Sequence, residues 1–310
     1  MFEPAYLKTL REGLFPERIS QAVQMLEECR VCPRECRVNR IKGETGFCNV
    51  GRLAMVSSAD PHFGEETPLV GRGGSGTIFL TSCNLKCSFC QNYEISNLNQ
   101  GQEVSTETFG SLMLGLQNLG CHNINFVTPS HVVPQILEAV AWAAERGLRV
   151  PLVYNTGGYD SVPTLRLLDG IVDIYMPDLK FMDERISAEL MHAPDYPVVV
   201  KRAILEMHRQ VGDLQVDESG VATRGLLVRH LVMPEGLAGT REAMRFLATE
   251  VSPHTYVNIM NQYRPCGRAY GHALIGRRIS RDEYLHALSM AQEEGITRLD
   301  ERVSLRLRFF

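Results

Sequence analysis

The sequence predicts an α/β protein whose parallel sheet forms a partial (β/α)6 barrel, preceded by an N-terminal cysteine-rich extension. From residue 77 onward, strand-like apolar runs alternate with helix-like runs, which is the pattern of strand–helix–strand units. Runs such as "VDIYM" are almost continuously apolar, which fits strands that are buried on both faces of a sheet. Six such units are fewer than the eight of a closed barrel, so we expect the barrel to stay open.

The predicted elements follow one another in a regular order. We predict strands at residues 77–81, 123–128, 149–155, 172–178, 226–232 and 255–260. A helix over 106–120 ends at Gly120, and a helix over 131–147 has Ser130 as its N-cap and Gly147 at its end. Further helices are predicted at 17–28, 183–192, 240–250 and 281–294, with a short strand within 53–58.

The 310-residue chain has the composition of a globular protein, with 44% hydrophobic and 22% charged residues. Its formal net charge of -4 gives no general attraction to nucleic acid or to anionic membranes, so we expect neither as a partner. No apolar run approaches the ~20 residues that span a bilayer, and the start "MFEPAYLKTLREG" lacks the apolar core of a secretory signal. We therefore expect a cytoplasmic protein.

The nine cysteines are distributed unevenly along the chain, since seven of them fall between Cys29 and Cys90. In a reducing compartment, clustered thiols are more typical of metal ligands than of disulfides. Cys121 follows a glycine that ends a helix and is expected in the core, and no substrate role is assigned to Cys266. The clustered cysteines fall into two sets with different spacings.

One set, Cys83, Cys87 and Cys90, follows the first predicted strand with gaps of three and two residues. Three thiolates can hold three irons of a cubic [4Fe–4S] cluster and leave the fourth iron open, whereas a closed cluster or structural zinc takes four ligands. The alternative is a zinc site that a distant histidine or cysteine completes. The lone histidines near strand ends, His131 and His230, are expected to be structural.

This motif resembles the signature of radical S-adenosylmethionine enzymes, and its place after the first strand is similar too. "CSFCQN", "YNTGG" (154–158), "MPDLK" (176–180) and "RHLVMPEG" (229–236) resemble segments of glycyl-radical-activating enzymes, typified by pyruvate formate-lyase-activating enzyme. The resemblance covers residues 75–265 and is to the pyruvate formate-lyase-activating-enzyme-like group. It implies that the open iron of a [4Fe–4S] cluster chelates S-adenosylmethionine, whose reductive cleavage gives a 5′-deoxyadenosyl radical that abstracts hydrogen.

The resemblance also implies roles for single residues. Asp178 would help to bind a monovalent cation beside S-adenosylmethionine, and Lys180 and Arg229 would face its carboxylate or the cleft. The Gly-Gly-Glu-Pro segment that usually contacts the amino group is replaced here by residues 128–131, so Thr128 and backbone carbonyls are expected to accept those hydrogen bonds. The full set of expected cofactor-binding residues is Asn92, Thr128, Asn155, Thr156, Asp178, Lys180 and Arg229.

The other set, Cys29-x2-Cys32-x3-Cys36-x11-Cys48, supplies four thiols within twenty residues. Four ligands make a closed site, either an additional iron–sulfur cluster or structural zinc. Thiolate ligands suit both metals, so the choice between them stays open. The neighbouring arginines could offset thiolate charge, contact a partner or simply be solvated; they are Arg30, Arg34, Arg37 and Arg40.

These observations divide the chain into an N-terminal helix with a metal-binding extension, residues 1–74, and a catalytic domain, residues 75–310. The first functional hypothesis is a radical enzyme that activates a glycyl-radical enzyme as its protein substrate. The second is a radical enzyme that acts on a small molecule or another peptide, and the third is a non-catalytic iron–sulfur or zinc scaffold. The resemblance implies an electron donor such as a flavodoxin or ferredoxin.

Overall fold

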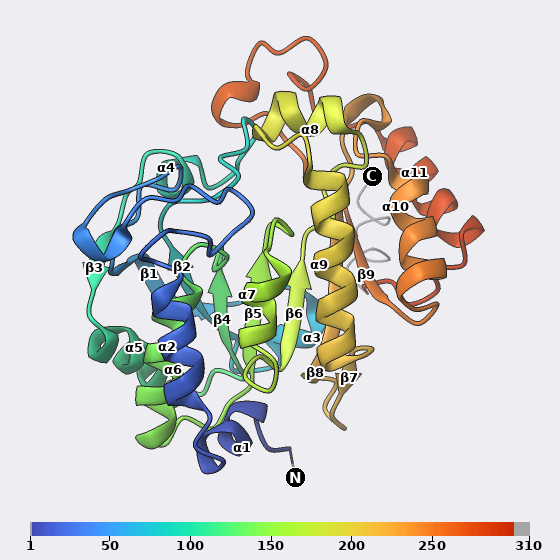
Figure 1. Cartoon of the computed structure of the whole chain (residues 1–310). Coiled ribbons are helices and arrows are strands. Elements are labelled where there is room, and N and C mark those ends of the chain that lie inside the picture. Colours follow the sequence, from blue (N-terminus) through green and yellow to red (C-terminus); the bar gives the residue numbers. More distant parts are fainter. Residues whose placement is uncertain (1, 301–310) are drawn as a thin grey trace.

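The computed structural model describes residues 2–300, and its strands pair in the order β3-β1-β2-β4-β5-β6-β8-β7, with β9 also paired to β8 (Figure 1). In the described part of the chain, β2, β4, β5, β6, β8 and β9 run parallel, and β2 and β9 do not pair with each other. The predicted partial barrel of six strands is therefore confirmed. The strands are β1 (Ala54–His62), β2 (Ser75–Leu80), β3 (Gln102–Val104), β4 (Ile124–Val127), β5 (Leu152–Thr156), β6 (Ile174–Pro177), β7 (Gln215–Val216), β8 (Ala222–Leu231) and β9 (Tyr256–Met260).

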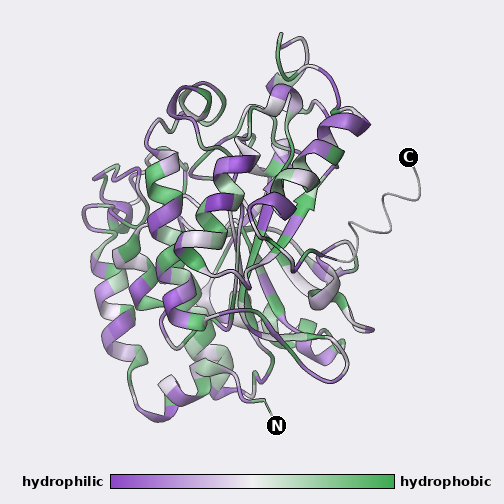
Figure 2. Ribbon diagram, turned by 90° about the vertical axis from the view of Figure 1, so that its right-hand side faces the viewer, coloured by the Kyte–Doolittle hydropathy of each residue, from purple (hydrophilic) through white to green (hydrophobic). Residues whose placement is uncertain are grey.

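The helices lie around this sheet and carry hydrophobic and hydrophilic residues on different faces (Figure 2). All the predicted helices are found, with ends that move by a few residues. The helices are α1 (Ala5–Arg11), α2 (Phe15–Gln24), α3 (Thr67–Val70), α4 (Tyr93–Ser96), α5 (Thr106–Asn118), α6 (Val133–Glu145), α7 (Val162–Leu167), α8 (Glu184–Met191), α9 (Tyr196–Val211), α10 (Thr240–Phe246, followed by a π-helical turn at Leu247–Val251) and α11 (Arg281–Glu293). Each of these helices is too short or too polar to cross a membrane.

The predicted helix ends are partly right. Gly120 and Gly147 follow α5 and α6 with φ values of 88° and 101°, the left-handed conformation expected of glycines after a helix. The prediction of Ser130 as the N-cap of α6 is wrong, because Val132 holds that position. The Ser130 hydroxyl lies 2.9 Å from Thr156 Oγ1 instead, so it joins α6 to the end of β5.

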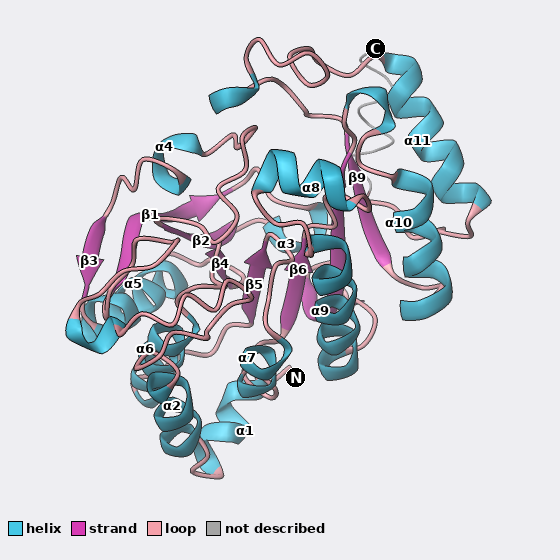
Figure 3. Cartoon of the chain, turned by 45° about the horizontal axis from the view of Figure 1, so that its top comes forward, coloured by secondary structure: helices cyan, strands magenta, loops and turns pink. Residues whose placement is uncertain are grey.

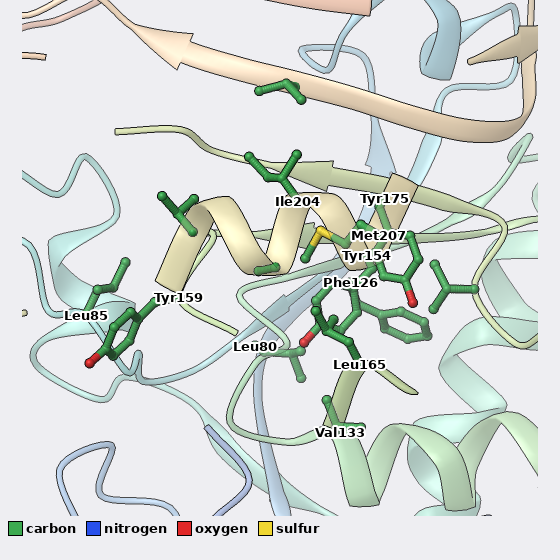
Figure 4. Packing of buried hydrophobic residues seen from close by; sticks show 14 of the residues in the cluster. Leu80, Leu85, Phe126, Val133, Tyr154, Tyr159, Leu165, Tyr175, Ile204 and Met207 are labelled. Atoms are coloured by element: carbon green, nitrogen blue, oxygen red, sulfur yellow. The ribbon is translucent and has the colours of Figure 1, made fainter. Parts of the chain in front are cut away.

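The strands bury different side chains on their two faces, as the period of two along a strand requires. Tyr154 and Tyr175 belong to the main core, which lies between the sheet and its helices, with ring centroids 5.6 Å apart. Figure 4 shows both rings close to Ile204 and Met207 of α9. Residues on the inner face of the strands form a smaller cluster together with Leu69 of α3 and Leu214 before β7. The strand residues of this cluster are Val153, Ile174, Met176, Ala222 and Leu227. Each fully buried side chain of this kind contributes about 1.5–3 kcal/mol.

The N-terminal residues are built into the same structure. β1 pairs antiparallel with β2, and Tyr6 and Leu26 belong to the main core. Asp173, beside β6, accepts hydrogen bonds from Ala5 N at 2.8 Å and from Leu152 N at 3.0 Å. The extension therefore packs on the barrel, and a domain boundary at residue 74 stays a prediction.

Candidate active site

The loop that follows β2 carries three cysteines at the carboxyl end of the parallel sheet, where loops gather near α4 and α8 (Figure 3). Cys87 is buried, whereas Cys83 and Cys90 are partly exposed. Ser82 and Lys86 have φ values of 73° and 49°, a strained conformation for residues other than glycine. This tight backbone lets all three cysteines line one cavity although they are close neighbours in the sequence.

The sulfur atoms of this loop have the surroundings of metal ligands. Leu85 N donates a hydrogen bond to Cys83 Sγ at 3.3 Å, and Ser96 Oγ donates to Cys90 Sγ at 3.1 Å. Hydrogen bonds of this kind tune iron–sulfur clusters. Burial raises the pKa of Cys83 and of Cys87, so the free thiols hold their protons near neutral pH. Metal binding would release those protons, and the donor set fits a three-thiolate cluster.

Three polar side chains stand where the inner face of the sheet reaches its carboxyl edge. Asn155 is on β5, Asp178 directly follows β6, and Arg229 is near the end of β8. Each comes two residues after a residue of the inner apolar cluster, so the alternation along a strand places it on the same face. Asp178 and Arg229 are also partners in a parallel β-bridge. The apolar inner face therefore ends in a row of polar groups.

These groups form a hydrogen-bonded chain. Lys180 Nζ lies 2.5 Å from Asp178 Oδ2, Arg229 Nε donates to Asp178 Oδ1 at 2.7 Å, and Arg229 Nη2 donates to Asn155 Oδ1 at 2.7 Å. Burial would raise the pKa of Asp178, but the charges of Arg229 and Lys180 outweigh it and lower that pKa. The Lys180 pKa is correspondingly raised, since the charges of Asp178 and Cys87 outweigh the effect of burial. All three charged groups are therefore ionised near neutral pH.

A cavity of about 230 Å³ joins the cysteine loop to this chain. It brings together residues from five separate segments, and their assignment to cofactor binding stays a prediction. All ten residues predicted for this site line the cavity, namely Cys83, Cys87, Cys90, Asn92, Thr128, Asn155, Thr156, Asp178, Lys180 and Arg229.

Two of the predicted cofactor contacts have additional structural features. Thr128, the first residue after β4, has φ of 64°, which is an outlier for a β-branched side chain and is typical of strained functional positions. Its N–H donates to Asn155 O at 2.8 Å. The Thr156 hydroxyl donates to Asp160 Oδ2 at 2.6 Å, so this side chain also holds the turn after β5.

Sequence reasoning missed several residues of this region. Met260 and Gln262 line the cavity from the end of β9. They stand two and four residues after Asn258, and because side chains alternate along a strand, this spacing could have predicted that they share its face. Glu65 and Glu66 come from the turn between β1 and α3, and no local motif singles them out.

The two glutamates line a second cavity of about 250 Å³. The residues that it shares with the first cavity are Asn92, Val127, Asn155, Arg229 and Gln262. Both carboxylates lie 3.9 Å from Arg229 Nη1. Burial and, secondarily, the charge of Glu66 raise the pKa of Glu65 to about 8, so Glu65 keeps its proton at neutral pH. Glu66 Oε1 accepts from Asn258 Nδ2 at 3.0 Å, while Oε2 has no hydrogen-bond partner among residues 2–300.

The second cysteine set gathers in a separate cavity. It is lined by Cys29, Cys32, Cys36 and Cys48 together with Val31, Arg34, Arg40, Gly46, Asn84 and His131. All nine cysteines are free of disulfides. No group of three or more cysteine, histidine, aspartate or glutamate side chains within residues 2–300 is arranged to hold a single metal ion, and both metal sites stay predictions.

The remaining cysteines, Cys121 and Cys266, and His230 do not line either cysteine cavity. Cys121 is buried in the main core, as predicted. Cys266 is buried too, in the loop after β9. His230 is structural, since Nδ1 lies 2.7 Å from Leu179 O and Nε2 lies 2.9 Å from Thr240 Oγ1.

Fold and site together define an α/β protein with an open barrel of parallel strands and a three-cysteine cavity at their carboxyl ends. No family model matches the chain. The chain is 29% identical over 293 residues to the uncharacterized protein MJ0674 of Methanocaldococcus jannaschii, an alignment that covers 93% of this chain and 81% of that protein.

Solved structures with a similar fold include a radical SAM methyltransferase from Sphaerobacter thermophilus, with a TM-score of 0.47, 17% identity, and coverage of 74% of this chain and 68% of that one. HydG, a maturase of the [FeFe]-hydrogenase, aligns with a TM-score of 0.49 and 14% identity, over 73% of this chain and 51% of that one. Methylornithine synthase (PylB) aligns with a TM-score of 0.46 and 15% identity, over 70% of this chain and 62% of that one. At these scores and identities, the likenesses do not bear on the reaction of this chain.

Proposed function

We propose that this protein is a radical S-adenosylmethionine enzyme that holds a [4Fe–4S] cluster with Cys83, Cys87 and Cys90. One observation carries the proposal: ten residues that the motif resemblance singles out, from five separate segments of the chain, line a single cavity. A scaffold that only bound a closed metal site would not require the charged groups that follow β6 and stand on β8 at the same place.

The chain itself would provide the ligands and the charges. When bound and reduced, the cluster supplies the electron that cleaves the sulfonium of S-adenosylmethionine and yields a 5′-deoxyadenosyl radical. Cys83, Cys87 and Cys90 would hold three of the four irons, which would leave one iron available to S-adenosylmethionine. Lys180 and Arg229 supply two positive charges that suit the carboxylate, and Asp178, hydrogen-bonded to both, orients them.

The amino group of the cofactor requires acceptors. Asn155 Oδ1 and the Thr128 carbonyl are proposed for this role, since both residues line the cavity and each carbonyl oxygen has two lone pairs. Phe89 and Met260 line the same cavity and give it apolar walls, which exclude water from a reactive intermediate.

Within this class, the resemblance favours hydrogen abstraction from the glycine of a glycyl-radical enzyme, with a flavodoxin or ferredoxin as electron donor in the cytoplasm. The alternative of a small molecule or another peptide as substrate keeps the same residues in the same roles. A non-catalytic iron–sulfur or zinc scaffold predicts no cleavage of S-adenosylmethionine at all.

The deciding experiment is anaerobic reconstitution with iron and sulfide, followed by dithionite and S-adenosylmethionine. We expect release of 5′-deoxyadenosine, and we expect Cys87→Ala to abolish it. Cys121→Ala removes a buried cysteine outside both cysteine cavities and is expected to retain the activity. An intact, reducible cluster that releases no 5′-deoxyadenosine contradicts the proposal.

The substrate is tested separately. Deuterium transfer into 5′-deoxyadenosine from a glycine-labelled glycyl-radical enzyme would support the activating role. Transfer from a labelled small molecule or peptide, with none from the glycyl-radical enzyme, would favour the alternative.

A further inference from the structure

Four cysteines line a cavity of their own, beside the one proposed for catalysis. Cys29, Cys32 and Cys48 are buried, and Cys36 is partly exposed. The chain passes very close to one sulfur at Gly46, where an added Cβ would lie 2.7 Å from Cys36 Sγ. Only glycine permits this approach, so the backbone is shaped around the thiols.

Arg40 is a buried cation at the same cavity, with its side chain 1% exposed. Its Nε donates to Gly51 O at 3.0 Å and its Nη1 donates to His131 O at 2.7 Å, while Nη1 lies 3.9 Å from Cys29 Sγ. Among residues 2–300, Nη2 has no hydrogen-bond partner and no carboxylate forms an ion pair with this guanidinium. A buried guanidinium stays charged and is costly unless an anion lies beside it.

His131 provides a second unpartnered group at this cavity. It is 1% exposed, and its Nε2 lies 3.0 Å from Thr81 O, whereas Nδ1 has no hydrogen-bond partner among the described residues. Buried polar atoms without partners are rare in folded proteins. Arg40 Nη2 is a donor without an acceptor at a cavity that four thiols also line, so this atom suits a negatively charged group there. His131 Nε2 faces a carbonyl oxygen and therefore carries the imidazole proton, which leaves Nδ1 with a lone pair that suits a metal or a hydrogen-bond donor.

We propose that Cys29, Cys32, Cys36 and Cys48 bind a metal centre through four thiolates and that Arg40 balances its charge. Each thiol gives up its proton on binding, and four thiolates around either a zinc ion or an iron–sulfur cluster carry a net negative charge. Both metals share this chemistry. This inference concerns a site outside the proposed catalytic cavity and does not depend on the proposed reaction.

The two cysteine cavities are neighbours. Asn84 lines the four-cysteine cavity, while Cys83 and Leu85, on either side of it, line the catalytic one. Arg34 Nε donates to Asn84 O at 2.8 Å, which ties the N-terminal loop to the three-cysteine loop. A metal centre here would therefore rigidify the loop that carries the catalytic cysteines.

The test uses the full chain with C83A, C87A and C90A combined, purified anaerobically and checked for folding by circular dichroism. We expect this variant to retain one bound metal centre per chain. Iron with sulfide and a visible absorption that dithionite bleaches would identify an iron–sulfur cluster, and colourless protein with zinc would identify a zinc site. A folded variant that contains neither metal overturns the proposal.

The location is tested by thiol alkylation mapped by mass spectrometry in the same variant, which avoids substitutions that could prevent folding. We expect the cysteines of this cavity to react only after a chelator removes the metal. Reaction at the same rate with and without the chelator overturns the assignment.

The role of the arginine is tested with Arg40→Met and Arg40→Lys. We expect a chelator to remove the metal about tenfold faster from Arg40→Met, with partial rescue in Arg40→Lys, because outer groups typically change metal affinity by about 10–100-fold. Arg30→Met is the matched control, since Arg30 is exposed and pairs with Glu28. Equal metal loss from Arg40→Met and Arg30→Met overturns the role of Arg40.

Discussion

Arg229 Nε donates a hydrogen bond to Asp178 Oδ1 at 2.7 Å, although the two residues are 51 positions apart, with Asp178 directly after β6 and Arg229 on β8. Lys180 Nζ meets the other carboxylate oxygen at 2.5 Å, so one anion holds two cations at the carboxyl end of the sheet. All three side chains are largely buried, with at most 17% exposed. Removing one partner of such a group leaves uncompensated charge, and this makes the site sensitive to single substitutions.

Asp178→Ala is expected to destabilise the protein by about 3–5 kcal/mol, because it leaves Lys180 and Arg229 buried without their anion. Urea unfolding monitored by circular dichroism measures this change. Glu3→Ala, which breaks an exposed ion pair with Arg11, should leave the unfolding midpoint nearly unchanged. If both variants unfold at the wild-type midpoint, Asp178 does not hold this end of the sheet together.

Lys180→Met is expected to weaken binding of S-adenosylmethionine to the reconstituted protein about 10–100-fold, because a charge-assisted hydrogen bond to a carboxylate is worth about 1.5–3 kcal/mol. Equilibrium dialysis under anaerobic conditions measures the affinity. Lys42→Met, at an exposed position far along the chain from the cavity residues, is the comparison variant. Unchanged affinity in Lys180→Met would show that the lysine serves only the ion pair with Asp178.

Much of this fold follows from local patterns. The six parallel strands are short apolar runs, and glycines such as Gly120 and Gly147 end the helices before β4 and β5, so these elements are recognisable without knowledge of their neighbours. Helix α9 was not predicted, because Pro197 and the valines of "YPVVV" suggest a strand. A proline in the first turn is compatible with a helix, and the buried residues Tyr196, Val200 and Ile204 recur at helical spacing.

The candidate site was predictable for the same reason, since three cysteines in one loop and polar residues at strand ends are local signals. Long-range contacts were not. Arg40 and His131 meet across 91 positions, and Glu66 reaches Asn258 across 192, so no spacing in the sequence relates them. These contacts depend on how the β1–β2 hairpin, which carries Glu66, and the N-terminal loop, which carries Arg40, pack against the barrel.

Glu65→Gln should become more stabilising as the pH rises. The pKa of Glu65 is raised from 4.5 to about 8, so between these values the unfolded chain loses this proton while the folded chain keeps it. The folded state then binds more protons, and wild-type stability falls as pH increases through this window. Glutamine does not titrate, so its advantage over wild type should grow by a few kcal/mol between pH 4.5 and pH 8. A pH-independent difference in unfolding free energy argues against a buried, protonated Glu65.

Gly158→Ala tests whether the turn after β5 fixes the ion pair. Gly158 has φ of 82°, and an added Cβ would lie 2.5 Å from Asp178 O. That carbonyl is held in place, because Tyr196 Oη donates to it at 2.8 Å. The substitution must therefore strain the turn or shift the strand end that carries Asp178 and Lys180.

We expect Gly158→Ala to cost about 2–4 kcal/mol of stability, the sum of left-handed strain and overpacking, and to weaken S-adenosylmethionine binding. Gly115→Ala is the matched control: Gly115 is exposed within α5 and a Cβ there meets nothing within 4 Å, so alanine should gain about 0.5–1 kcal/mol through helix propensity. Urea unfolding and equilibrium dialysis measure the two effects. Wild-type stability in Gly158→Ala would mean that the Asp178 strand end can move, and the rigidity argued for this site would be wrong.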